Sequence, residues 1–158
     1  MTEPAARSIV VEREMPHPPE RVWHALTQSA LIEDWLMPND FQPIVGHKFQ
    51  FRWKPVAGWN GVADCEVLVL EPPHRLAWSQ NASGEQVATG LKSVVTWTLT
   101  PTRRGVLVRM EHSGFRPQDE AGHKTMSGGW PRVLEALERV AGVPPTRLKG
   151  APASSDVR

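Results

Sequence analysis

The chain has 158 residues, 40% of them hydrophobic, which suits one domain with a sizeable core. Its 18 Lys and Arg against 17 Asp and Glu leave a net charge of +1, which argues against a dedicated nucleic-acid-binding protein. A single cysteine, Cys65, excludes an internal disulfide and a CxxC metal site. No apolar run reaches the roughly 18 residues of a membrane span, and residues 1–11 have no apolar signal segment. We therefore expect a cytoplasmic protein without a membrane partner or a metal.

The first predicted elements are a strand and two short helices. Ser8–Met15 contains consecutive β-branched residues and predicts a strand. Three prolines end it, and a helix can start at Pro18, with Glu20 at its positive end. A second short helix begins at about Ser29 and ends before Pro38.

Five further strands are predicted from alternating apolar residues and β-branched runs. They cover residues 48–53, 62–70, 76–80, 91–100 and 106–112. Turns are expected at Gly58–Gly61 and Asn81–Gln86, where glycine and asparagine accumulate. In the first of these strands Phe49, Phe51 and Trp53 share the apolar face.

Pro117–Ala141 predicts a long amphipathic helix, because its apolar residues recur at helical spacing. Pro131 interrupts this pattern, since it has no N–H for the helix hydrogen bond. Gly128 and Gly129, just before it, are poor helix formers. Either a kink at Pro131 or two separate helices would accommodate these residues.

The order of elements predicts an α+β fold, in which an antiparallel sheet of about six strands curves round the long C-terminal helix. Hairpin-connected strands between helices do not fit a doubly wound parallel sheet. The last helix is the long amphipathic element that can cover one face of the sheet. The predicted domain spans residues 7–142, and residues 1–6 and 143–158 have the composition of flexible tails.

Five segments in register resemble the START-like superfamily, also called Bet v 1-like or SRPBCC. They are REMPHPPERVWHALT at 13–27, LIEDWLMP at 31–38, GHKFQFRW at 46–53, GVADCEVLVLEPPHRLAWSQ at 61–80 and GGWPRVLEALERV at 128–140. Within it, the chain is more closely similar to bacterial proteins related to the C-terminal domain of the activator of Hsp90 ATPase. The resemblance implies a helix-grip fold with one continuous last helix, and therefore a kink at Pro131.

A curved sheet around one helix leaves a space between them, and tryptophans are expected to converge on it. Apolar walls with a few polar groups are typical of small-molecule pockets. The predicted lining residues are Trp35, Phe51, Trp53, Trp78, Gln80, Met110, His112, Met126 and Trp130. Gln80 and His112 would orient a guest, whereas Trp23 and Trp97 are expected to be plain core residues.

Other patterns do not add a convincing catalytic or metal site. Asp119 and His123 share a helix face, but a metal site needs three or four ligands. Ser127 lacks the strand-turn-helix context of a hydrolase nucleophile. Cys65 lies within a strand, where a buried thiol is inert packing.

Three functions remain, in order of preference. The first is the binding of a hydrophobic or aromatic small molecule in the cavity, without a cofactor. The second, implied by the resemblance, is a chaperone partner that acts on an Hsp90 through its surface; 158 residues leave no room for the separate N-terminal domain of the eukaryotic activator. The third is a polyketide cyclase or dehydratase, placed last because no acid/base pair is expected to face the cavity. The sequence leaves the oligomeric state open, a dimer included.

Overall fold

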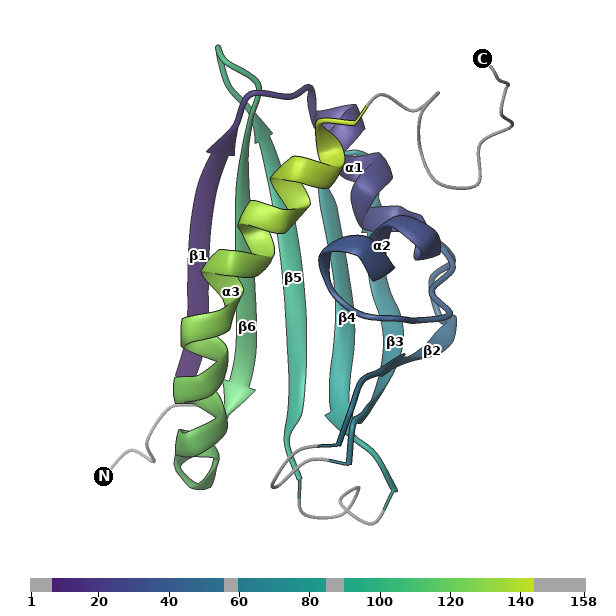
Figure 1. The fold of residues 1–158 in the computed structure, drawn as a ribbon, viewed down its shortest axis with the longest axis vertical. Helices are drawn as coiled ribbons and strands as arrows, with labels where there is room; N and C mark the ends of the chain where they lie inside the picture. Colours follow the sequence, from purple (N-terminus) through teal and green to yellow (C-terminus); the bar gives the residue numbers. More distant parts are fainter. Residues whose placement is uncertain (1–6, 56–59, 85–89, 144–158) are drawn as a thin grey trace.

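Six antiparallel strands form one curved sheet, and the helices lie against its concave face (Figure 1). The structure is a computed structural model that describes residues 7–55, 60–84 and 90–143. Its elements are β1 (Arg7–Met15), α1 (Pro19–Thr27), α2 (Ser29–Trp35), β2 (Lys48–Arg52), β3 (Val62–Glu71), β4 (Arg75–Ala82), β5 (Lys92–Pro101), β6 (Val106–Phe115), a 3-10 turn (Pro117–Asp119) and α3 (Glu120–Ala141). The strand order is β1-β6-β5-β4-β3-β2, which confirms the predicted α+β helix-grip fold.

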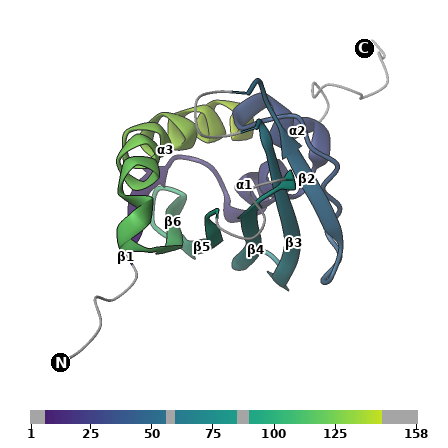
Figure 2. The ribbon, with the colours of Figure 1, turned by 90° about the horizontal axis from the view of Figure 1, so that it is seen from below.

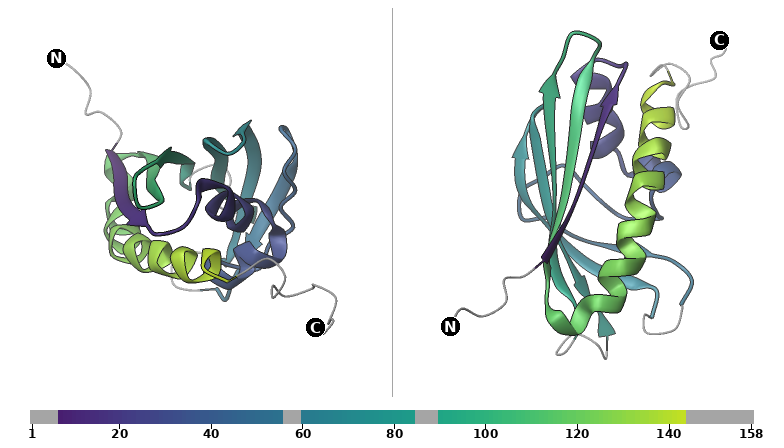
Figure 3. Two further views of the ribbon diagram at one scale, coloured as in Figure 1. Left: turned by 90° about the horizontal axis from the view of Figure 1, so that it is seen from above. Right: turned by 90° about the vertical axis from the view of Figure 1, so that its left-hand side faces the viewer.

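The sheet and α3 form two layers (Figure 3, right), and the view along the strands shows the sheet curving beneath the helix (Figure 2). Two bulges interrupt the ladders. In β6 the extra residue is Gly114, whose φ of 108° favours glycine. In β3 it is Leu68, which lies between Val67 and Val69 and is exposed.

The short helices follow from local sequence rules. Pro19 occupies the first turn of α1, where its missing N–H costs nothing, and Glu20 lies at the positive end of the helix. In α2, Leu31, Ile32 and Trp35 are buried. Both helices contact α3, so the three helices together cover the concave face of the sheet.

α3 buries a stripe of residues at helical spacing, namely Trp130, Leu134, Leu137 and Ala141. An ion pair from Arg13 of β1 to Glu138, 2.7 Å between Nε and Oε1, fixes the helix across the sheet edge. Pro131 lies inside one continuous helix, and α3 visibly bends along its length (Figure 1). The continuous helix confirms the choice against two separate helices. None of the described helices is long and apolar enough to cross a membrane.

The outer edge of β2 is covered by the segment that precedes it. The backbone N–H of Arg52 donates to the carbonyl of Pro38 at 3.0 Å. The backbone N–H of Gln50 donates to Asp40 Oδ1 at 2.7 Å, and Asn39 forms a bridge with Phe51. Two donors of this edge strand, the backbone N–H groups of Gln50 and Arg52, are therefore bonded within the chain.

Two expectations differ from the structure or lie beyond it. β2 ends at Arg52, so Trp53 lies after the strand, and with 56% of its surface exposed it does not share the buried face of Phe49 and Phe51. Residues 58–59 of the turn expected at 58–61 and residues 85–86 of the loop expected at 81–86 lie outside the described residues. The expected tails lie outside them too, apart from Val143.

A substitution in α3 tests whether its glycines serve packing. A Cβ built at Gly129 meets nothing within 4 Å, so we expect Gly129→Ala to raise the free energy of unfolding by about 1 kcal/mol through helix propensity. Gly114→Ala is the matched control, because a Cβ there lies 2.8 Å from the carbonyl oxygen of Lys92 and φ is positive. Urea unfolding measures both, and a loss of stability in Gly129→Ala would contradict this account.

Candidate functional site

A cluster of aromatic rings occupies the space between the sheet and α3. We call Trp35, Trp78, Trp97 and Trp130 the indole cluster. Trp97 of β5 lies at its centre, with ring centroids 5.4 Å from Trp35 of α2, 6.2 Å from Trp78 of β4 and 5.8 Å from Trp130 of α3. The cluster therefore joins the sheet to two helices.

The structure brings most of the predicted lining residues to this interior. Phe51, Trp78, Met110 and His112 are fully buried, and Trp35 and Trp130 nearly so. Met126 is partly buried against the core, and Gln80 accepts a hydrogen bond from Trp78 Nε1 at 3.1 Å. Trp53 is the exception, because it is exposed beyond the end of β2.

Three of the four indoles in the cluster have a partner for their N–H group. Trp35 donates to the carbonyl of Ala25 at 2.9 Å, and Trp78 donates to Gln80. Trp130 donates to His112 Nδ1 at 3.1 Å. Trp97 Nε1 is buried, and it has no hydrogen-bond partner among the described residues. A buried donor without a partner costs about 1–3 kcal/mol.

His112 is part of a chain of buried hydrogen bonds. Because Nδ1 accepts from Trp130, the proton of the neutral ring lies on Nε2. Nε2 then donates to Ser93 Oγ at 2.8 Å, and that hydroxyl donates to the carbonyl of Gln80 at 2.6 Å. Both ring nitrogens are therefore engaged by the protein, which leaves neither as a free base.

The environment of His112 keeps its ring neutral. Burial, together with the smaller effect of the nearby His123 of α3, lowers the pKa of His112 from 6.5 to about 4. Protonation of Nδ1 would also place its N–H opposite the indole N–H of Trp130, so that two donors would face each other without an acceptor. The native protein therefore holds an uncharged imidazole at neutral pH.

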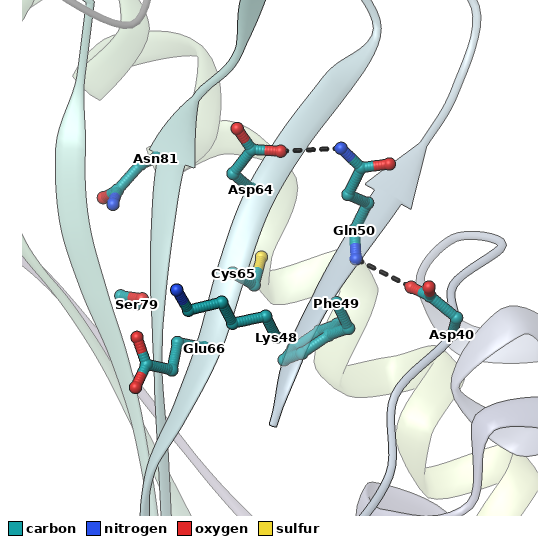
Figure 4. A pocket seen from close by; sticks show the side chains of 9 residues that line it. All are labelled: Asp40, Lys48, Phe49, Gln50, Asp64, Cys65, Glu66, Ser79 and Asn81. Atoms are coloured by element: carbon teal, nitrogen blue, oxygen red, sulfur yellow. Dashed lines mark hydrogen bonds between the residues drawn. The ribbon is translucent and has the colours of Figure 1, made fainter. Parts of the chain in front are cut away.

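Sequence reasoning missed a hollow on the outer face of the sheet, away from the indole cluster (Figure 4). It measures about 510 Å³ and is lined by Asp40, Lys48, Phe49, Gln50, Asp64, Cys65, Glu66, Ser79 and Asn81. Strand register places its polar residues side by side, because Lys48 pairs with Glu66 and Gln50 with Asp64. Gln50 Nε2 donates to Asp64 Oδ1 at 2.8 Å. The alternating polar positions of β2, β3 and β4 were the available signal.

The remaining sequence candidates have structural partners. Arg116 binds Asp119 through two hydrogen bonds of 2.8 and 2.9 Å and lowers the pKa of that carboxyl. His123 instead packs its ring on Phe115. Burial raises the pKa of the Cys65 thiol. Within residues 7–55, 60–84 and 90–143, no group of three or more His, Cys, Asp or Glu side chains could hold a metal ion.

Comparison with known proteins gives the family. The family model described as Activator of Hsp90 ATPase homolog 1-like protein matches residues 16–142, which is most of the chain and every described element after β1. The chain belongs to this family. It is an SRPBCC domain, as the five sequence segments implied. No match was found among curated proteins.

Solved structures agree with this membership. Protein MLL2253 from Mesorhizobium loti is 50% identical, with 85% of this chain and 96% of that chain covered and a TM-score of 0.76. Mll3558 from Rhizobium loti is 26% identical, with 85% and 96% covered and a TM-score of 0.72. CalU16 from Micromonospora echinospora is 26% identical, with 87% and 77% covered and a TM-score of 0.65.

The buried imidazole makes stability depend on pH. Below about pH 6.5 the unfolded ring takes up a proton, whereas the native ring stays neutral until about pH 4. The stability that His112 contributes is therefore complete above pH 6.5, and about 3 kcal/mol is lost as the pH falls to 4. Urea unfolding at a series of pH values measures this slope. In His112→Gln, which keeps a neutral donor and acceptor, the slope in this window should fall; an unchanged slope would assign it to other groups.

Proposed function

We propose that the indole cluster is the binding site of a hydrophobic or aromatic small molecule, held between the sheet and α3. The observation that carries this proposal is a buried set of indoles from both layers with an unpaired donor at its centre. Aromatic walls with few polar groups suit such guests. The fold of the family is consistent with ligand binding or a cyclase-like role.

A guest must separate rings that now touch one another. The N-terminal half of α3 is the element suited to move. This half contains three glycines at which an added Cβ would meet no atom within 4 Å, namely Gly122, Gly128 and Gly129. Close packing therefore does not require glycine at these positions, although glycine destabilises a helix. Pro131 removes the hydrogen bond to the carbonyl of Ser127. The helix is thus weakest directly before and after Trp130, which belongs to the cluster.

The interior favours binding over catalysis. The buried titratable side chains of the described chain are His112 and Cys65. Both nitrogens of His112 are engaged, and its low pKa makes it a poor base at neutral pH. Cys65 has a raised pKa, so it holds its proton and is a poor nucleophile.

A chaperone role is the second candidate. The family description names the activator of Hsp90 ATPase, and the polar hollow on the outer face gives this chain an uncovered surface for a protein partner. Such a role would use the face of the sheet opposite the indole cluster. The ATPase rate of a purified bacterial Hsp90, with and without the chain, separates the two functions.

Binding in the indole cluster can be measured with N-phenyl-1-naphthylamine, a neutral dye that fluoresces in apolar sites. We expect saturable binding with energy transfer from tryptophan. Trp130→Phe should weaken it several-fold, because the cluster loses ring area and a hydrogen bond. Trp53→Phe is the control, since Trp53 is exposed and apart from the cluster. An affinity that responds to Trp53→Phe and not to Trp130→Phe would place the dye on the surface.

Opening of α3 can be followed by hydrogen exchange. We expect residues 120–127 to exchange faster than residues 133–140, because the glycines and Pro131 weaken the first half of the helix. The dye should slow exchange in the first half as it fills the interior. Equal protection of both halves, unchanged by the dye, would exclude an opening of the N-terminal half of α3.

A further inference from the structure

Among the four indole N–H groups of the cluster, that of Trp97 is the one without a hydrogen-bond partner in the described part of the chain. Its three neighbours donate to Ala25, Gln80 and His112, so their N–H groups are satisfied within the protein. Trp97 Nε1 is buried and finds no acceptor among the residues that the structure describes. Because an unpaired buried donor is costly, an acceptor supplied by a guest would gain more here than at a group that is already bonded.

Trp97 is fully buried at the centre of the indole cluster, so a guest that separates these rings would lie next to its indole. Its ring lies between Trp35, Trp78 and Trp130, at centroid distances of 5.4–6.2 Å. Two of these contacts are edge-to-face, so a planar ring that enters between the sheet and α3 meets indole faces and edges. An acceptor on the edge of that ring can reach Trp97.

The charge of the guest is constrained by the interior. The buried polar side chains of the described residues are Thr27, Ser83, Ser93 and His112. None carries a charge at neutral pH, since the pKa of His112 is about 4. An ionised guest would lose its hydration without gaining a counter-ion, which is strongly unfavourable.

We propose that Trp97 selects the ligand: the site takes an uncharged, planar aromatic molecule that carries a hydrogen-bond acceptor, and Trp97 Nε1 donates to that acceptor. This inference rests on the proposed binding site in the indole cluster. It makes Trp97, which sequence reasoning assigned to plain packing, the group that determines specificity.

Three probes of equal ring size test the proposal at pH 7.5. Naphthalene has no acceptor, quinoline has a ring nitrogen and is neutral at this pH, and 2-naphthoate is an anion. Titrations followed by ¹H–¹⁵N spectra give the affinity and the indole N–H signals together. We expect quinoline to bind about tenfold more tightly than naphthalene, the equivalent of one hydrogen bond to a buried donor. 2-Naphthoate should bind more weakly than either, and the Trp97 indole signal should move downfield with quinoline alone.

Trp97→Phe should abolish the preference for quinoline while naphthalene still binds. Trp35→Phe is the matched control: it also removes an indole from the cluster, but one whose N–H is already bonded to Ala25, so the preference should remain. If Trp97→Phe does not fold, 3-benzothienylalanine at position 97 keeps the ring and replaces the N–H with sulfur. Equal affinities for naphthalene and quinoline in the unmodified protein would overturn the role of Trp97 and leave the proposed site standing. If none of the probes binds, the proposed function itself is overturned.

Discussion

The contact of Trp97 with Trp35, Trp78 and Trp130 is the interaction on which the rest of the interior depends. These rings come from α2, from the consecutive strands β4 and β5, and from α3, so they join the start, the middle and the end of the fold. Each large aromatic side chain buries about 150–250 Å², so a few rings hold the sheet against the helices. The same indoles give the interior a polarisable aromatic surface, which suits an aromatic guest. Stability and the proposed binding therefore draw on the same side chains.

The fold was predictable because its signals are local and repeated. Alternation in β2 to β6 and the helical spacing of Trp130, Leu134 and Leu137 each fix an element and its buried face. The direction of most site residues followed from strand phase, as the burial of Trp78, Met110 and His112 shows. The prediction that Trp53 lies on the buried face was wrong, because side chains alternate between the two faces only inside a strand and β2 ends one residue earlier.

The candidate site was predictable only in composition. Strand phase can say that a side chain points inward, but it cannot say whether that side chain touches a neighbour or lines open space. Hydrogen-bond satisfaction is equally a tertiary property: Trp35 and Trp97 look alike in the sequence, yet one indole N–H meets a carbonyl and the other meets none. For the same reason the sequence suggested His112 as a guest contact, whereas Trp130 and Ser93 occupy both its nitrogens.

The cover on the outer edge of β2 has a consequence for the behaviour of the protein in a crowded cell. Exposed sheet edges invite strands from other molecules and so seed aggregation. Here Pro38 and Asp40 accept the hydrogen bonds that a foreign strand would need from Arg52 and Gln50. The segment between α2 and β2 thus covers this edge of the sheet. Loss of the Asp40 carboxylate would free the backbone N–H of Gln50 at this edge for intermolecular β-pairing.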